Sequence, residues 1–526
     1  MLIFIITLFI TFLYLIFKTK NNLHMFQQNF YNENNRYLKW LVKNKKVFNE
    51  DILFILIILL GLFIKDSILG ILLIIFYIIM LVRKISYLKK EQVKIPLKFT
   101  SRVYRLIFTI CLIYLVPIII LFNSNISIIS YLVLGLLISL NSIIIYLANI
   151  VNKPIEKIVY YSYKTKASKK LNSLSNLEVV GITGSYGKTS SKNILNTILS
   201  EKFNSITTPK NFNTEYGLMI TINNYIDKFN DIFVAEMGAF TTGRIKKLCD
   251  FVKPKYGILT KIGTAHLETF GSIENIQKTK FELIESLPED GIGVLNKDDE
   301  LQVYYKLKNN CKIVWIAIND KTADVYADNI KITSQGMSFD CHFKNDKNTY
   351  KFETKILGNA NVYNILSAIA LGKELGMSIK EMQLGTKKIK SIEHRLELKK
   401  SGRITYIDDA YNSNPVGSKM ALDVLNLMEG KKIIVTPGMI ELGEEEYKLN
   451  KEFGHQIAEV CDRVILVGKN QTKAIHDGLK EKKYDENKID IINDVKEAFN
   501  IINRMHEDNI YVLLENDLPD IFNERK

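Results

Sequence analysis

The fold is decided by one stretch, VVGITGSYGKTS at residues 179–190. An apolar strand runs into a glycine turn, and a Lys-Thr pair then opens a predicted helix over residues 191–199. In this order the amides of the turn and of the helix N-terminus face an anion, Lys188 adds a positive charge, and the Thr189 hydroxyl can hold Mg²⁺. Ile182 stands where the strict G-x-x-x-x-G-K-[ST] pattern has its first glycine, so the tighter form T-G-S-Y-G-K-T-S is the one that fits. The stretch predicts a nucleotide-phosphate loop formed by Gly184, Ser185, Gly187, Lys188, Thr189 and Ser190.

Charge is distributed unevenly along the 526 residues, whose formal net charge is +14. Residues 1–175 hold 22 Lys/Arg and six Asp/Glu, whereas the remainder holds 48 basic and 50 acidic residues. The basic surplus therefore belongs to the N-terminal part, and the rest of the chain lacks the basic balance typical of nucleic-acid binding. The five cysteines form no C-x-x-C pair, so we expect neither a metal knuckle nor a disulfide framework.

Five apolar runs precede residue 151, and a membrane span needs about 20 such residues. They cover residues 1–17, 52–64, 68–82, 106–122 and 126–150. The first run has no basic segment before it and no small-residue cleavage site after it, so we interpret it as an anchor and not as a signal peptide. The second and third runs are short and form either a tight hairpin of spans or one re-entrant element.

Loop charge sets the expected orientation of these spans. Residues 18–50 carry seven Lys/Arg and residues 83–105 carry eight, whereas the connections at 65–67 and 123–125 carry a single lysine between them. Five spans with cytoplasmic basic loops predict a multi-pass protein of the cell membrane, with its N-terminus outside and everything after Asn152 in the cytoplasm. Residues 151–176 are interpreted either as a juxtamembrane helix near anionic headgroups or as a solvated charged linker.

From residue 177 onward, short apolar strands alternate with helical stretches such as 273–287. This alternation predicts a mostly parallel sheet covered on both faces, with ligands at the carboxyl ends of the strands. The expected fold is an α-helical transmembrane region followed by α/β domains, of which the central one is of P-loop type and the smaller C-terminal one is Rossmann-like. The domains are placed at 1–150, 151–176 (linker), 177–394 and 395–526, and strands are expected at 177–182, 232–236, 256–260, 293–295, 312–316, 404–408, 432–436, 463–467 and 509–514.

Two polar residues stand where predicted strands end. Glu236 closes the strand 232–236, and a carboxylate at the end of a strand beside a phosphate loop commonly holds Mg²⁺. His266 follows another strand within the small-residue segment Gly263-Thr264-Ala265. A lone histidine is more often structural than a ligand, but this junction favours a functional role.

The segment from 178 to about 450 resembles the Mur ligases, the ATP-dependent amide-forming enzymes of cell-wall peptide assembly. Among them, D-D-x-Y-N-x-N-P at residues 408–415 is similar to the subgroup that adds D-alanyl-D-alanine, called MurF. The other matching segments, in family order, are T-G-S-Y-G-K-T-S (183–190), N-F-N-T-E-Y-G (211–217), E-M-G (236–238), G-T-A-H (263–266), K-F-E (280–282), L-N-K-D-D (295–299), G-N-A-N-V-Y-N (358–364), H-R-L-E (394–397) and M-I-E-L-G (439–443).

The resemblance implies a role for each matched position. Lys188 would contact the ATP phosphates, and Thr189 and Glu236 would hold one Mg²⁺. Lys280 would be carbamylated and would ligate a second Mg²⁺ together with His266. The expected catalytic residues are thus Lys188, Lys280, His266 and Arg395. Asn296 would contact the adenine, and Asn364 and Arg395 would contact the nucleotide. Arg395 would lie near the transferring phosphate. Asp409 would contact the ribose or the interdomain nucleotide surface.

The implied reaction turns a carboxylate into an acyl phosphate, which an amine then attacks to give an amide, ADP and phosphate. The expected partners are a small-molecule or lipid-linked peptide precursor and an amino acid or dipeptide; the oligomeric state is left open. The chain departs from the family pattern at its N-terminus, where membrane spans replace the soluble domain that holds the UDP-sugar. It departs also at Lys261, Ala360, Arg244 and the C-terminal segment 513–520, which lacks the expected K-G-S.

The sequence is compatible with several functions. D-alanyl-D-alanine addition leads, followed by a pseudomurein-type peptide ligase and a poly-gamma-glutamate or capsule-type ligase. A membrane-anchored NTPase would need paired nucleotide domains or a coupling motif, and neither is evident in the sequence. A noncatalytic scaffold is disfavoured because Lys188, Glu236, His266, Lys280 and Arg395 are all present.

Overall fold

The computed structural model describes residues 2–44, 52–53, 56–57, 59, 63–90, 96–123, 128–333, 336–391, 394–410, 413–440 and 442–517. The chain divides into two compact units, one built on residues 1–162 and the other on residues 163–518.

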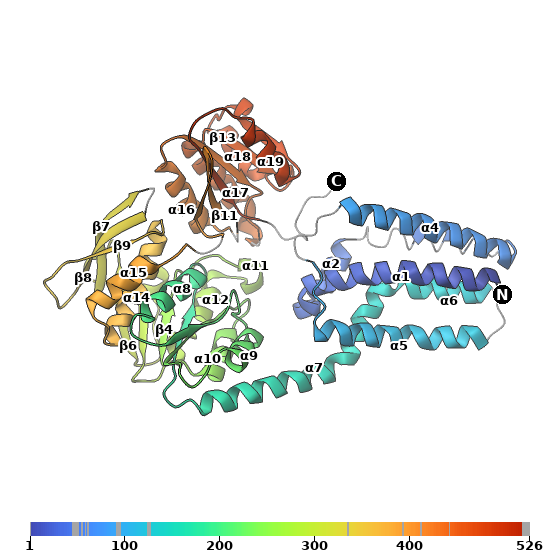
Figure 1. Ribbon diagram of the computed structural model, residues 1–526, viewed down its shortest axis with the longest axis horizontal. Coiled ribbons are helices and arrows are strands. Elements are labelled where there is room, and N and C mark those ends of the chain that lie inside the picture. The colour runs from blue at the N-terminus through green and yellow to red at the C-terminus, as the bar shows by residue number, and fades with distance from the viewer. Residues whose placement is uncertain are drawn as a thin grey trace. The chain divides into compact units, whose positions relative to one another are not determined.

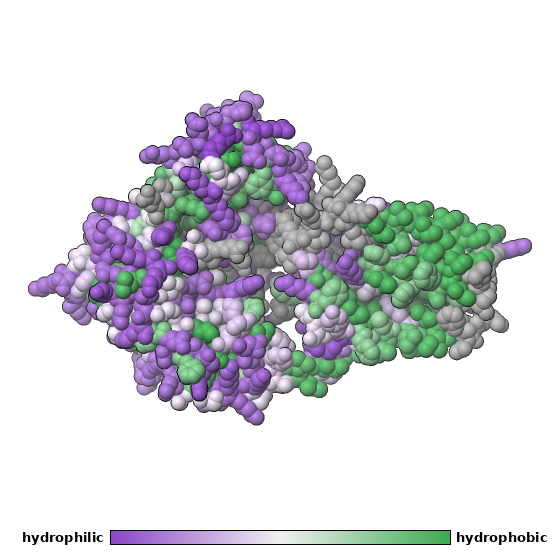
Figure 2. All heavy atoms as spheres, in the orientation of Figure 1, coloured by the Kyte–Doolittle hydropathy of each residue, from purple (hydrophilic) through white to green (hydrophobic). Residues whose placement is uncertain are grey.

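The first unit is a bundle of helices whose outer surface is apolar. Helix α1 packs against α4, and α5 packs against α6. Phe9, Phe108 and Ile120 are 61%, 66% and 62% exposed, and Figure 2 shows an almost continuous hydrophobic surface over this unit. A contiguous apolar surface of this size suits contact with lipid. The elements are α1 (Leu2–Gln28), η1 (Phe30–Asn35), α2 (Arg36–Lys43), α4 (Asp66–Lys90), α5 (Ser101–Asn123), α6 (Ile128–Ser139) and α7 (Asn141–Asn172), the last of which runs on into the second unit.

Two helices in the described part of the chain are long and apolar enough to cross a membrane, Ile3–Gln28 and Ser101–Ile120. A third span results if α6 and α7, which are bent by 74° from each other, are counted as one. Residues Ile68–Arg83 form a shorter apolar helix, and most of the run 52–64 lies outside the described residues. The five-span topology and its orientation therefore stay predictions. Helix α7 continues through Asn172, which confirms the helical interpretation of the segment after residue 150.

The second unit contains a central sheet with strand order β2-β3-β1-β4-β5-β6-β7-β8-β9 among the described residues. Strands β2 to β7 pair in parallel, as the sequence predicts. Strands β8 and β9 add an antiparallel extension that the alternation of strands and helices did not predict. The strands are β1 (Glu178–Thr183), β2 (Ser205–Thr207), β3 (Ile232–Glu236), β4 (Tyr256–Leu259), β5 (Ile292–Asn296), β6 (Lys312–Ala317), β7 (Val325–Thr333), β8 (Gly336–Phe343) and β9 (Tyr350–Thr354).

Strand order places the phosphate-type loop at the switch point of this sheet. Strand β1 pairs with β3 on one side and β4 on the other, and the chain leaves β1 into α8. Ligands of open α/β sheets bind at such a point, beyond the carboxyl ends of the strands. The helices around the sheet are α8 (Lys188–Leu199), α9 (Glu215–Asn224), α10 (Arg244–Val252), α11 (Leu267–Phe270), α12 (Ile273–Phe281), α13 (Glu300–Val303), α14 (Asn359–Glu374) and α15 (Ile379–Lys388) (Figure 1).

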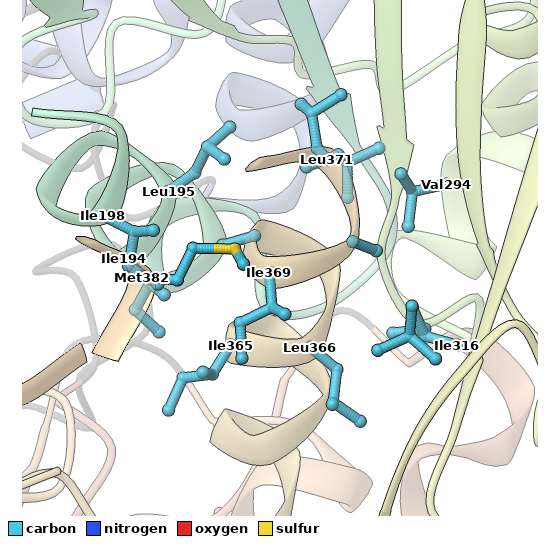
Figure 3. Packing of buried hydrophobic residues seen from close by; sticks show 14 of the residues in the cluster. Ile194, Leu195, Ile198, Val294, Ile316, Ile365, Leu366, Ile369, Leu371 and Met382 are labelled. Atoms are coloured by element: carbon cyan, nitrogen blue, oxygen red, sulfur yellow. The ribbon is translucent and has the colours of Figure 1, made fainter. Parts of the chain in front are cut away.

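Packing of α8 against α14 forms the core beneath the loop (Figure 3). Ile194 and Ile198 of α8 and Leu366 of α14 are fully buried in one cluster. Each buried side chain of this size contributes about 1.5–3 kcal/mol relative to an exposed one. This core fixes the N-terminus of α8 against the sheet, and so it fixes the loop.

The C-terminal part of the second unit has its own six-stranded sheet, of order β10-β11-β15-β12-β13-β14 within the described chain. All pairs are parallel except β10 with β11. The elements are β10 (Glu397–Ser401), β11 (Ile404–Asp409), β12 (Lys431–Thr436), β13 (Arg463–Val467), β14 (Ile489–Ile492) and β15 (Ile510–Glu515), with α16 (Pro415–Asn426), α17 (Glu446–Val460), α18 (Lys473–Glu481) and α19 (Val495–Asn503).

Two predicted helix boundaries differ from the observed ones. Helix α8 begins at Lys188 and not at residue 191, because Gly187 takes a left-handed conformation (φ 82°) and turns the loop directly into the helix. The helix expected over 273–287 ends at Phe281, and residues Ile284–Ser286 form a 3-10 turn. A Cβ at Gly181 would lie against Leu283. The residues after Phe281 therefore pack their apolar side chains against glycines of the sheet, and the regular helix ends there.

Candidate active site

The loop after β1 is shaped by close contact with the end of β4. Gly184 and Gly187 have φ values of 153° and 82°. A Cβ at Gly184 would lie 1.9 Å from Thr260 Oγ1, and that hydroxyl donates a 2.6 Å hydrogen bond to the Tyr186 carbonyl. Glycine at position 187 has no side chain with which to cap α8. The first amides of the helix are therefore available to an anionic ligand.

The Lys188 side chain folds back over its own loop. Its Nζ donates hydrogen bonds of 2.7 Å to the Gly184 carbonyl and 3.1 Å to the Ser185 carbonyl. Burial lowers the pKa of Lys188 to about 8; Glu236 opposes this shift and Arg395 adds to it. Phosphate oxygens are stronger partners for an ammonium than carbonyl oxygens are, so a bound nucleotide would displace these contacts.

Glu236, at the end of β3, is 1% exposed and faces the loop. Its Oε1 accepts hydrogen bonds from Thr189 Oγ1 at 3.2 Å and from Asn213 Nδ2 at 3.1 Å. Its Oε2 lies 3.0 Å from Lys192 Nζ in an ion pair. Both oxygens of the Glu236 carboxylate therefore have partners. One of these partners is the hydroxyl of Thr189, which the sequence predicts to bind the same Mg²⁺ ion.

Lys280 and His266 line the same cavity as Lys188 and Glu236. The Lys280 side chain is 3% exposed, and its Nζ lies 5.7 Å from the centre of the Phe270 ring. Burial, with a further contribution from Lys188, holds the pKa of Lys280 well below its usual range, although Glu282 opposes the shift. His266 has a left-handed backbone (φ 60°), and its ring packs edge-on against Phe240 at 4.6 Å. The site thus brings a buried lysine side chain and an imidazole to the same cavity.

The oxygen donors present fit a magnesium ion only in part. Thr189 and Glu236 supply a hydroxyl and a carboxylate, the hard ligands that Mg²⁺ takes. Within the described ranges no group of three or more His, Cys, Asp or Glu side chains could hold a metal ion. The residues therefore suit a cation that takes further ligands from nucleotide phosphates, and a carbamate on Lys280 would add another.

Three neighbouring cavities meet at the loop, and Gly187 lines all of them. A cavity of about 240 Å³ is lined by Gly184, Ser185, Lys188, Thr189, Glu236, His266, Lys280 and Arg395. A second, of about 420 Å³, includes Asn296 and Asn364, and a third, of about 460 Å³, includes Ser190, Asn364, Arg395 and Asp409. The structure therefore brings every predicted site residue to the same switch-point region.

The residues predicted for the nucleotide are themselves fixed by hydrogen bonds. Asn364 Oδ1 accepts a hydrogen bond from Ser191 Oγ at 2.8 Å, and the backbone N–H of Asn296 donates one to Gln302 Oε1 at 2.9 Å. Ala360 lines both larger cavities, and its methyl group fills little of them. A preformed apolar and amide-lined cavity beside a phosphate loop suits a nucleoside.

Asp409 belongs to a buried carboxyl pair. It stands opposite Glu515 in the parallel register of β11 and β15, and Ser413 Oγ donates a 2.6 Å hydrogen bond to Glu515 Oε1. Burial raises the pKa of Asp409 to about 6, with Arg395 opposing the shift, and burial together with Asp409 raises the pKa of Glu515 well above its usual range. The surroundings of this pair therefore favour the protonated carboxyl groups.

Lys192, Asn213 and Glu515 are functional-site residues that the sequence reasoning missed. Lys192 lies one helical turn after Lys188, and that i, i+4 spacing is a signal that could have revealed it. Asn213 falls within the quoted segment 211–217, but its contact with Glu236 comes from the fold. Glu515 stands in the segment noted only as a departure from K-G-S. Tyr411, Asn412 and Glu441 of the predicted motifs lie outside the described residues.

Comparison with known proteins identifies relatives over this second unit. Residues 182–372 match the Mur ligase middle domain, and residues 394–514 match the Mur ligase, glutamate ligase domain. The UDP-N-acetylmuramoyl-tripeptide--D-alanyl-D-alanine ligase of Escherichia coli (strain K12) is 31% identical over 56% of this chain and 66% of its own length. The ligase of the same name from Buchnera aphidicola subsp. Acyrthosiphon pisum is 30% identical over 59% of this chain and 70% of its own length.

A solved structure shows the same fold. The MurF ligase of Thermotoga maritima in complex with ADP is 25% identical, with a TM-score of 0.61 over 69% of this chain and 81% of that one. This chain spans just under two thirds of the length of the E. coli relative. The family models, the relatives and the shared fold agree over one continuous region. The chain belongs to the Mur ligase family.

Proposed function

We propose that this chain is an ATP-dependent, ADP-forming ligase that joins a carboxylate to an amine through an acyl phosphate. One observation carries the proposal. A single cavity at the switch point brings together Lys188, Glu236, Lys280 and Arg395, and it adjoins the cavity that holds Asn296 and Asn364. A phosphate cradle, a metal-type carboxylate and a second cation are the groups that phosphoryl transfer needs.

The chemistry follows from the charges at the cavity. A carboxylate is a poor acylating agent, and transfer of the γ-phosphoryl group gives it a good leaving group. Negative charge spreads over the transferring oxygens, where Lys188 and Arg395 stabilise it. An amine then attacks the acyl carbon and phosphate leaves. Mg²⁺, when bound, would neutralise phosphate charge, and Thr189, Glu236, His266 and Lys280 are the residues that would hold it.

The proposal also assigns a covalent modification, a carbamate, to Lys280. Burial lowers the pKa of Lys280 and so favours the neutral amine, the form that attacks CO₂. The nitrogen–carbon bond forms and the nitrogen proton passes to water, which leaves a carbamate anion. This exchange places an anionic oxygen ligand where the described side chains otherwise offer only Glu236. We therefore propose a carbamylated Lys280 and a pair of Mg²⁺ ions.

The proposed substrates come from the relatives and from the motif at 408–415. Both curated relatives carry the name of a D-alanyl-D-alanine ligase acting on a UDP-N-acetylmuramoyl tripeptide. We propose a peptide carboxylate of a cell-wall precursor as acceptor and D-alanyl-D-alanine, or a similar amine, as the second substrate. The apolar helical unit favours a protein of the cell membrane, and the basic loops at 18–50 and 83–105 favour catalytic domains that face the cytoplasm. Such a protein could take an acceptor linked to a lipid as well as one linked to UDP.

Phosphate release by the full-length protein tests the proposal. The protein is supplied with ATP, Mg²⁺, a UDP-linked or lipid-linked muramyl tripeptide, and either D-alanyl-D-alanine or single amino acids. We expect release only when acceptor and amine are both present, and we expect the dipeptide to be preferred. Release with ATP alone at the full rate would favour the membrane NTPase. Turnover with L-glutamate and not with the dipeptide would favour the capsule-type ligase.

A further inference from the structure

Lys192 is a fully buried lysine that the proposed chemistry does not use. Its side chain is 1% exposed, and Glu236, its partner in the ion pair, is also 1% exposed. Its Nζ donates a 2.9 Å hydrogen bond to the Thr208 carbonyl and a further bond to the Lys210 carbonyl. The ammonium is thus satisfied on three sides and ties α8 to β3 and to the segment after β2.

This ion pair changes the charge available to a metal. Glu236 is the one acidic side chain among the described residues lining the 240 Å³ cavity, and Lys192 cancels its charge. Lys188 and Arg395 line the same cavity and add two positive charges. The surroundings are therefore net positive, whether or not Lys280 carries the proposed carbamate. A bare divalent cation is repelled from such a site, whereas the complex of a divalent cation with ATP is an anion and is attracted.

We propose that Lys192 is a positioning residue that neutralises Glu236 and keeps the nucleotide-free site closed to a bare divalent cation, so that the metal enters together with the nucleotide. This inference rests on the proposed ATP-dependent function. The donor set agrees with it, because the four side chains proposed to hold metal, those of Thr189, Glu236, His266 and Lys280, are too few to fill the coordination of two Mg²⁺ ions without phosphate oxygens. The ion pair also leaves Glu236 Oε1 directed at Thr189, the geometry that the incoming metal would use.

A purely structural role for Lys192 makes a different prediction. If the lysine only anchors the segment 208–210, its removal would loosen that segment and would weaken metal binding or leave it unchanged. If it neutralises Glu236, its removal leaves a buried carboxylate with no counter-ion, and that carboxylate would bind a divalent cation even without nucleotide. The sign of the change in metal affinity separates the two roles.

The experiment measures binding of Mn²⁺ to the full-length protein in detergent by electron paramagnetic resonance, without nucleotide and with ADP. The variants are Lys192→Met, Lys192→Arg, and the double variant Lys192→Met with Glu236→Gln. Lys202→Met is the matched control, because it removes the same charge from an exposed position just after α8. Circular dichroism and the thermal midpoint verify that each variant is folded.

We expect wild-type protein and Lys202→Met to bind Mn²⁺ only when ADP is present. Lys192→Met should bind Mn²⁺ without nucleotide about tenfold more tightly than wild type or better, and Lys192→Arg should behave like wild type. The double variant should lose the gain, because it has no carboxylate to expose. If Lys192→Met does not fold, Lys192→Gln takes its place, because it removes the same charge and keeps a hydrogen-bond donor for the Thr208 carbonyl.

Tight binding of Mn²⁺ to the wild-type protein without nucleotide would overturn the inference, and so would a folded Lys192→Met variant that gains no affinity. Neither result affects the proposed reaction, since phosphate release with acceptor and amine is measured separately. Conversely, nucleotide-dependent Mn²⁺ binding without any ligase product would refute the proposed reaction and leave the role of Lys192 standing.

Discussion

Removing CO₂ should inactivate this protein if Lys280 acts as a carbamate. An ordinary lysine of pKa about 10.4 is neutral in roughly one molecule in a thousand at neutral pH. Lys280 is 3% exposed and its pKa is held well below that value. Its reactive neutral form is therefore enriched relative to that of an ordinary lysine, and dissolved CO₂ can react with it.

The assay follows amide formation in bicarbonate-containing buffer, in CO₂-depleted buffer, and with Lys280→Ala. Loss of the anionic ligand should lower kcat about 10²–10³-fold, the effect typical of removing one group that stabilises transition-state charge. Acetate or formate should restore part of the activity of Lys280→Ala, because a small carboxylate fits the space that the side chain leaves. Carbon-13 bicarbonate should give a carbamate signal in the wild-type protein that is absent from the variant.

Lys278→Ala is the matched control, since Lys278 lies on the same helix, α12, and is exposed. It should keep normal turnover and normal dependence on CO₂. Near-normal turnover of Lys280→Ala, or a wild-type rate indifferent to CO₂ together with no carbamate signal, would refute the reasoning.

Three further outcomes are expected. Lys188→Ala should lower ATP turnover by about 10²–10³-fold with little change in thermal midpoint, and near-normal turnover would remove the loop from the mechanism. The pKa values of Asp409 (about 6) and Glu515 are raised, so the folded protein keeps protons that the unfolded chain releases. The free energy of unfolding should therefore rise as pH falls from about 7 to about 5. Glu515→Gln should therefore exceed wild type in thermal midpoint most at about pH 8 and least near pH 5.5, and an equal difference at every pH would contradict the raised pKa values. Leu366→Ala should lower the free energy of unfolding of the second unit by about 2–5 kcal/mol in urea titrations, because Leu366 is fully buried in the core cluster around α14; a loss under about 1 kcal/mol would contradict that packing.

Much of the fold was predictable because the second unit follows local rules closely. Strand 232–236 was predicted with its observed bounds, and β1, β4, β5 and β6 were found within one or two residues. These are buried parallel strands, whose continuous apolar runs stand out in a sequence. The antiparallel extension β8–β9 was missed because its pairing is set by contacts with β7 and not by alternation with helices.

The candidate site was predictable where a residue belongs to a motif and not where only the fold creates its partner. Lys188, Thr189 and Glu236 stand at strand and helix ends that the sequence marks. Only the four-residue spacing from Lys188 distinguishes Lys192 in the sequence. Its role depends on the carboxylate of Glu236, which lies 44 positions away along the chain. Glu515 acquires its role only because β15 pairs with β11. The span count was not settled by hydropathy because apolar runs of 13 to 15 residues fall below the length of a span.

The most direct test of the proposed function uses an acceptor whose carboxylate carries oxygen-18. Formation of an acyl phosphate transfers one carboxylate oxygen to the γ-phosphoryl group, so that oxygen leaves with phosphate when the amine attacks. The full-length protein, supplied with ATP, labelled acceptor and D-alanyl-D-alanine, should release phosphate carrying one oxygen-18 for each amide formed. Unlabelled phosphate, or labelled phosphate released without amide formation, would contradict the account.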